Sequence, residues 1–266
     1  MYYFTERMIE ADIERVREIE RRSFSTLWSA ATYRHEIRDN PSARYIVVRA
    51  SAVPPPPAQP PARRGLLTRL LPWLAPPAPP NPHQIVGYGG VWRSVNEGHI
   101  TAIAVVPEHR GRGVGELVLN GLIDQAITLD AEILALEVRV SNTNAQQLYL
   151  KYGFRPLGTR QRYYTDNSED ALMMWTESIR APGYQQHLTL LRAALFARLR
   201  DAANGTIPVA PLPVASYGAT GDGGVRGADG GVRGADGGVR GADGGVRGAD
   251  GGVRTQHAAS LRDRLQ

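Results

Sequence analysis

The chain has 266 residues and a net charge of +5, and its 29 glycines and 19 prolines gather mainly in two segments. It contains no cysteine, which excludes disulfides, a thiolate zinc site and a cysteine nucleophile. Basic and acidic residues nearly balance over residues 1–50 and 85–180, so the excess positive charge does not predict a direct nucleic-acid partner.

No secretory signal is expected at the N-terminus. A secretory signal needs a basic stretch followed by an apolar run, and residues 1–12 have neither. A membrane span needs roughly 18 consecutive apolar residues, and no window of the sequence provides them. We therefore expect a cytoplasmic protein.

The first fifty residues predict two helices and one strand. Apolar residues recur at helical spacing among Glu and Arg over residues 11–24, which is typical of an amphipathic helix. Ser29 is placed to cap a second, short helix. Residues 44–50 are rich in β-branched side chains and predict a strand.

A proline-rich insert at residues 53–83 interrupts this pattern, because proline runs favour polyproline II and cannot continue a sheet. Within it, residues 63–74 carry several leucines and a tryptophan. Two interpretations stay open: a short helix in weak contact with a membrane surface or a partner, or a disordered loop insertion with an apolar patch. The second is favoured, since long insertions in loops cost little stability.

From residue 84 onwards strands and helices alternate. Strands are predicted at 85–92, 99–106, 133–140, 163–164 and 171–175, and helices at 114–127 and 144–152. The first two strands are joined by a turn around residues 96–98, and Gly153 is placed to end the second helix. This order predicts a mixed α/β unit around one sheet.

The C-terminal part predicts one extra helix within residues 181–204, from leucines at helical spacing. The heptad GADGGVR then recurs towards the end of the chain. Three glycines per copy exclude a coiled coil, and the copies hold too few apolar groups to offset the entropy of ordering. We expect residues 205–266 to form a disordered tail.

Residues 110–115 (RGRGVG) follow a predicted strand, open a predicted helix and fit the pattern R-x-x-G-x-G. Free backbone N–H groups and the helix dipole at such a turn attract an anion, and glycine lets a phosphate approach the backbone. The loop lacks the GK[ST] ending of a P-loop and the G-x-G-x-x-G of dinucleotide folds. The pattern alone therefore indicates a generic phosphate-binding loop.

Two residues on the C-terminal side of this loop are candidates for acid–base chemistry. Glu137 lies in the middle of an otherwise apolar strand, on the face that it shares with Arg139. It is either a general base, or a residue paired with Arg139 or on a solvated edge. Tyr149 lies on the apolar face of the following helix, where it is either a core residue or a proton donor.

These segments resemble the GNAT acetyltransferases. The R-x-x-G-x-G turn is similar to the pyrophosphate loop of that family. The run L-E-V-R-x-S-N…A…L-Y…Y-G-F is similar, more narrowly, to the RimI-type ribosomal-protein-alanine N-acetyltransferases. So are FSTLWS at residues 24–29 and the YY…EDA…M ending at residues 163–174. The resemblance covers about residues 1–50 and 85–177; the proline-rich insert and everything after residue 180 depart from it.

The resemblance implies a GNAT domain over residues 1–180, interrupted at 53–83, with a central mixed, mostly antiparallel sheet flanked by helices. It implies acetyl-CoA as the co-substrate, with the pantetheine arm along the strand and the pyrophosphate on the loop. The implied cofactor-binding residues are Ile103, Ala104, Val105, Arg110, Gly111, Arg112, Gly113, Val114, Gly115 and Asn142. No metal is expected, since the six histidines show no ligand spacing.

The resemblance also implies direct transfer to the free amino terminus of a protein, typically an N-terminal Ala of a small-subunit ribosomal protein. Glu137 would accept a proton from the α-ammonium, directly or through water, Tyr149 would protonate the departing thiolate, and the backbone at residues 103–105 would help to stabilise the oxyanion. Candidate substrate contacts are Phe24, Trp28, Tyr163 and Tyr164, although the last two also fit ordinary strand aromatics.

Two other hypotheses remain. The first is a GNAT enzyme that acts on a small amine or an internal lysine, with the same fold and a different acceptor groove. The second is a non-catalytic acetyl-CoA-binding module that tethers partners through the insert and the tail. The presence of both Glu137 and Tyr149 argues against the second.

Overall fold

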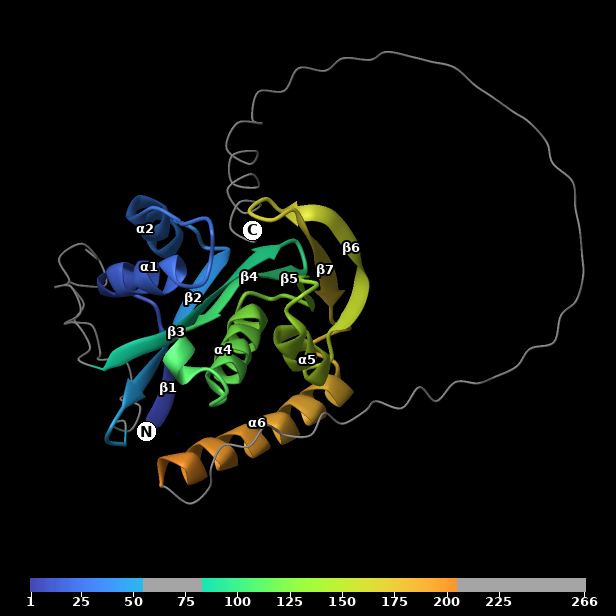
Figure 1. The fold of residues 1–266 in the computed structure, drawn as a ribbon. Helices are drawn as coiled ribbons and strands as arrows, with labels where there is room; N and C mark the ends of the chain where they lie inside the picture. Colours follow the sequence, from blue (N-terminus) through green and yellow to red (C-terminus); the bar gives the residue numbers. More distant parts are fainter. Residues whose placement is uncertain (55–82, 205–266) are drawn as a thin grey trace, which may run out of the picture.

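The computed structural model describes residues 1–54 and 83–204. The predictions for the amphipathic segment 63–74, for most of the proline-rich insert and for the tail at 205–266 lie outside the described residues. The two described ranges form one mixed α/β structure around a seven-stranded sheet (Figure 1).

The sheet has the strand order β1-β2-β3-β4-β5-β7-β6. Its members are β1 (Tyr2–Arg7), β2 (Ala43–Ser51), β3 (Gln84–Ser94), β4 (Glu97–Val105), β5 (Ile133–Arg139), β6 (Arg155–Tyr164) and β7 (Glu169–Trp175). β4 and β5 pair in parallel, whereas the other neighbours pair antiparallel. The predicted fold class, a mixed and mostly antiparallel sheet flanked by helices, is confirmed.

Helices cover both faces of the sheet (Figure 1). They are α1 (Ile13–Arg21), α2 (Ala30–Arg38), α4 (Val114–Thr128), α5 (Thr143–Lys151) and α6 (Pro182–Ala203). Two consecutive residues of β2 identify the faces, because neighbouring side chains of a strand point to opposite sides. Tyr45 packs against Tyr33 of α2, and Ile46 lies against Gly121 of α4. The helices α1 and α2 therefore lie on one face and α4 on the other.

The sequence placed most elements correctly and missed others. Ser29 caps α2 by accepting a hydrogen bond from the Thr32 amide, and Gly153 follows α5 with a φ of 82°, as predicted. The strand β1 was not predicted, because its alternation of half-buried and exposed residues is short and weak. β6 is also longer than predicted, since this strand at the sheet edge exposes most of its side chains and carries little apolar pattern.

A buried carboxylate joins the α1–α2 layer to the sheet. Glu20, near the end of α1, is fully buried and accepts hydrogen bonds from the hydroxyls of Tyr33 at 2.8 Å and Tyr88 at 3.0 Å. Its backbone carbonyl accepts from the amides of Ser23 and Phe24. The network fixes the point at which the chain leaves α1, and the residues there line the pocket described below.

We predict that Tyr88→Phe lowers the free energy of unfolding by about 2 kcal/mol, because a buried carboxyl oxygen of Glu20 loses one of its hydrogen-bond donors without any other change of shape. Urea denaturation followed by circular dichroism measures the change. Tyr2→Phe in the edge strand β1 serves as the control, because this hydroxyl lies outside the network. Equal stability of Tyr88→Phe and wild type would contradict the role given to Glu20.

Candidate active site

A pocket opens where the two central strands separate. Within the described residues, β4 pairs with β5 only from Glu97–His99 to Ile133–Ala135, although both strands continue beyond these pairs. The pocket between the two strands has a volume of about 170 Å³. Residues 100–103 of β4 form one wall and residues 136–139 of β5 the other, and Phe24 and Tyr149 add apolar surface. Backbone groups of β4 that would otherwise pair with β5 are therefore available to a bound molecule.

The loop between β4 and α4 is shaped as an anion cradle. Gly111 and Gly113 have φ angles of 71° and 84°, which residues with a side chain rarely adopt. A Cβ added to Gly111 would meet no atom within 4 Å, so the backbone there is open to an approaching group. Gly113 is the N-cap of α4, and amides of the first helical turn point into the loop without intrahelical partners.

Two arginines add positive charge to this loop. The Nε of Arg110 donates to the carbonyl of Val105 at 3.0 Å, which holds the start of the loop against the end of β4. Arg112 is exposed one residue before the N-cap. The open glycine backbone, the helix N-terminus and the two guanidinium groups together fit a pyrophosphate.

Two cations hold the carboxylate of Glu137. Its side chain is 4% exposed and its oxygens lie 2.9 Å from His99 Nε2 and 3.0 Å from Arg160 Nη1. Burial raises the pKa of Glu137, but its contacts with His99 and Arg160 outweigh burial, and the pKa ends below its ordinary value. The sequence left open that Glu137 pairs with Arg139 or lies on a solvated edge, and both alternatives are wrong. Strand order and register instead bring His99 of β4 and Arg160 of β6 to this side chain.

His99 is a charged residue that the sequence analysis did not single out. Burial lowers its pKa, but the pairing with Glu137, and with Glu97 at 3.5 Å, outweighs burial and raises the pKa to about 9. His99 is therefore an imidazolium at neutral pH. Only its place next to β5 in the sheet could have revealed this role, since the sequence separates it from Glu137 by almost forty residues.

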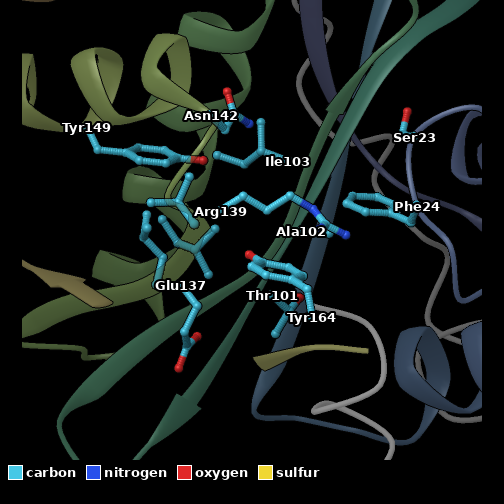
Figure 2. A pocket seen from close by; sticks show the side chains of 13 residues that line it. Ser23, Phe24, Thr101, Ala102, Ile103, Glu137, Arg139, Asn142, Tyr149 and Tyr164 are labelled. Carbon is cyan, nitrogen blue, oxygen red and sulfur yellow. The ribbon is translucent and has the colours of Figure 1, made fainter. Parts of the chain in front are cut away.

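Tyr149 enters the pocket from α5. Its side chain is buried, and its hydroxyl points towards Ile103 of β4, while the carboxylate of Glu137 points away from it (Figure 2). Burial raises the pKa of Tyr149 well above its ordinary value. The phenol is therefore protonated throughout the neutral range and can serve as a proton donor.

Arg139 lines the pocket, and its side chain extends towards Phe24 past the ring of Tyr164 (Figure 2). Its guanidinium carbon lies 3.9 Å from the centre of the Tyr164 ring, and its nitrogens reach Asp166 at 2.8 Å and Glu169 at 3.0 Å. Asp166 stands in the turn between β6 and β7, and Glu169 is the first residue of β7. The arginine thus ties β5 to the segment that joins β6 and β7.

Comparison with known proteins decides the family. Residues 62–154 match the model of the acetyltransferase (GNAT) family. A Bacillus subtilis protein, named as a proposed ribosomal protein bS18-alanine N-acetyltransferase, is 37% identical over 164 residues, which cover 62% of this chain and 88% of the relative. The chain belongs to the GNAT acetyltransferase family. It is accordingly an N-acetyltransferase, and the hypothesis of a non-catalytic module is set aside.

Two further similarities agree with this GNAT assignment. The ribosomal protein bS18-alanine N-acetyltransferase of Haemophilus influenzae is 30% identical over 170 residues, which cover 62% of this chain and 93% of the relative. The crystal structure of Ard1 from Thermoplasma volcanium superposes with a TM-score of 0.50 at 22% identity, over 67% of this chain and 99% of that one. The second similarity concerns the fold alone.

Of the remaining predicted site residues of this GNAT enzyme, some line the pocket and others do not. Phe24 and Tyr164 line the pocket, whereas Tyr163 packs edge-on against Tyr164 and beneath Arg160. Trp28 does not lie in the pocket wall: it is buried in the core against Tyr33 and Tyr45, because the α1–α2 connection turns its apolar side inwards.

The predicted cofactor residues also divide into exposed and buried positions. Ile103 and Asn142 line the pocket. The side-chain oxygen of Asn142 already accepts a hydrogen bond from the Ala145 amide as the N-cap of α5. Ala104 and Val114 are buried, so only their backbone groups could serve a ligand.

Two negative findings concern the described residues only. Over residues 1–54 and 83–204, no cluster of three or more His, Asp or Glu could hold a metal ion. Over the same residues, no helix is both long and apolar enough to cross a bilayer.

We predict that His99 titrates near pH 9, whereas His109 titrates below the ordinary histidine value because it is partly buried beside Arg112. The histidine signals in an NMR pH titration measure both. The raised pKa means that His99 stabilises the fold fully below about pH 6.5 and loses this contribution as the pH rises through about 9.

Glu137→Gln removes the charge that faces His99 while keeping its shape, so we expect the pKa of His99 to fall and that of His109 to stay unchanged. An unaltered His99 titration in this variant would contradict the ion pair.

Proposed function

We propose that this GNAT enzyme transfers an acetyl group from acetyl-CoA to the free α-amino group of a protein, and that the acceptor is the N-terminal alanine of ribosomal protein bS18. The names of the Bacillus and Haemophilus relatives, which the chain covers over 88% and 93% of their lengths, carry the choice of acceptor. A cytoplasmic location follows from this acceptor. The pocket with Tyr149 and Glu137 on different walls supports the chemistry.

Acetyl-CoA, when bound, supplies the acyl thioester that the amine attacks. The glycine backbone of the 110–115 loop and the first turn of α4 would hold its pyrophosphate, with Arg110 and Arg112 adding charge. The backbone edge of residues 103–105, which does not pair with β5, would hydrogen-bond the amide-rich pantetheine arm in the way that it would pair with a neighbouring strand. The amide of this edge would also stabilise negative charge on the acetyl oxygen.

Glu137 would accept the proton of the incoming ammonium. Its pKa is lowered, so it is a weak base, and its carboxylate is held by His99 and Arg160 rather than aimed at Tyr149. A protein α-amino group has a pKa near 8, only modestly above neutral, so even a weak base can accept its proton. We infer that the proton passes to Glu137 through water.

This weak base also bears on the competing acceptors. A lysine ammonium has a pKa of about 10.4, and its deprotonation near neutral pH needs roughly 3 kcal/mol more than that of an α-ammonium. The lowered pKa of Glu137 therefore favours an amino terminus over an internal lysine or an aliphatic polyamine.

Tyr149 would donate a proton to the departing thiolate. Its hydroxyl points across the pocket towards β4, and burial keeps it protonated. The acceptor would reach the pocket past Phe24 and Tyr164, beneath the Arg139 contact with the β6–β7 turn. Trp28 and Tyr163 would support these walls from behind.

The function is tested by following thiol release from acetyl-CoA with four acceptors. They are a peptide with a free N-terminal alanine, the same peptide acetylated beforehand, an internal-lysine peptide and a polyamine. We expect turnover only with the free alanine terminus, and a loss of about 100-fold in kcat/KM in Glu137→Gln. Glu97→Gln, which also faces His99, is the matched control and should retain most of the activity. Preference for lysine or polyamine would overturn the proposed acceptor.

We further predict that Tyr149→Phe lowers kcat by about 100-fold and leaves the KM of acetyl-CoA nearly unchanged, because a proton donor is lost without loss of packing. Tyr184→Phe is the matched control: this tyrosine of α6 also has a pKa raised by burial but lies away from the pocket. Steady-state kinetics on both variants decide the point, and equal effects of the two substitutions would argue against an acid role for Tyr149.

A further inference from the structure

The helix α6 packs directly against the anion cradle, although it lies beyond the residues that match the family model. Leu195 and Leu199 of this helix are buried. A Cβ added to Gly113 would lie 3.2 Å from Leu195, 3.3 Å from Leu199 and 3.2 Å from Nη2 of Arg198. The N-cap of α4 is thus closed by α6 on one side, while Gly111 is open.

Arg198 also forms an ion pair just inside the cradle. Its Nη2 lies 2.6 Å from Glu116, a residue in the first turn of α4 whose side chain is 8% exposed. Glu116 also accepts from Lys151 at 2.5 Å and from the Tyr152 hydroxyl at 2.9 Å. Burial raises the pKa of Glu116, but these donors outweigh burial and leave the pKa lowered, so the group is ionised.

An ionised carboxylate in this place opposes the binding of an anion. The first turn of a helix attracts a phosphate because its free amides carry partial positive charge, and a neighbouring negative charge cancels that attraction. Lys151 alone makes the pair with Glu116 neutral, and Arg198 brings the cluster of three to a charge of +1. Arg198 therefore makes the charge behind the cradle positive where it would otherwise be neutral.

A second set of contacts holds α6 in place independently of Arg198. Arg192 donates from Nε to the side-chain oxygen of Asn120 at 3.0 Å and from Nη2 to Asp124 at 2.6 Å, both on α4. His187 lies 3.0 Å from the carbonyl of Lys151 at the end of α5. These contacts fix the helix along α4, so that loss of the Arg198 side chain need not undock it.

We propose that Arg198 is a positioning residue for the pyrophosphate of acetyl-CoA: it packs against Gly113 and the first turn of α4 and gives the Glu116 cluster behind them a net positive charge. The inference rests on the proposed use of acetyl-CoA. It assigns to α6 a part in binding this co-substrate and none in the acyl transfer itself.

The test compares Arg198→Met with Arg198→Lys and with Arg200→Met, an exposed arginine of the same helix. Calorimetry measures the Kd of CoA, and kinetics measure KM for acetyl-CoA and for acetyl-pantetheine, which lacks the phosphates. We expect Arg198→Met to raise the Kd of CoA and the KM of acetyl-CoA by about tenfold, with kcat and the KM of the peptide unchanged. Acetyl-pantetheine should serve all variants equally, Arg198→Lys should recover most of the affinity, and Arg200→Met should match wild type.

An unchanged Kd of CoA in Arg198→Met would overturn the inference. An equal rise of the KM for acetyl-CoA and for acetyl-pantetheine would also overturn it, because it indicates general damage to the fold. Thermal unfolding of each variant identifies such damage, and Arg198→Lys keeps the charge if Arg198→Met fails to fold. Failure of wild type to bind CoA would overturn the proposed function as well, whereas normal binding by wild type with an unaffected variant would overturn the role of Arg198 alone.

Discussion

The separation of β4 from β5 after His99 is the constraint on which the rest of the site depends. A sheet that stayed paired along both strands would bury its backbone groups in the ladder and leave no room between residues 100–103 and 136–139. The separation creates the pocket and leaves a free backbone edge beside it. It also gives Glu137 neighbours from both sides, since His99 ends the paired part of β4 and Arg160 comes from β6.

A gap in the middle of a sheet weakens the structure there, and two buried carboxylates hold the helices on either side. On one face, Glu20 ties α1 to α2 and β3 through two tyrosine hydroxyls. On the other face, Glu116 ties α4 to α5 and α6 through Lys151 and Arg198. Each carboxylate stands directly behind a segment that faces the pocket or the cradle. The polar networks therefore fix the walls that strand pairing does not.

Local features could be predicted from the sequence, and features that depend on strand register could not. The 110–115 loop was recognised because its glycines, arginines and helix start lie within a few residues of one another. Strand alternation likewise placed Glu137 and Arg139 on one face. Their partners were missed, because Arg160 and Asp166 come from β6 and the turn after it, and β6 carries little apolar pattern. Trp28 was assigned to the acceptor groove from a local motif, whereas its burial depends on the packing of α2.

The proposed acid and base differ in protonation because their surroundings differ. Desolvation alone raises the pKa of Tyr149, whereas Glu137 is also largely hidden from water but faces two cations that lower its pKa. Both groups thus rest at neutral pH in the state that a direct transfer needs, the phenol protonated and the carboxylate ionised. The same cations make Glu137 a weak base, so the reaction they permit is one with an amine that is already partly neutral. A free amino terminus meets this condition near pH 8, and a lysine side chain does not.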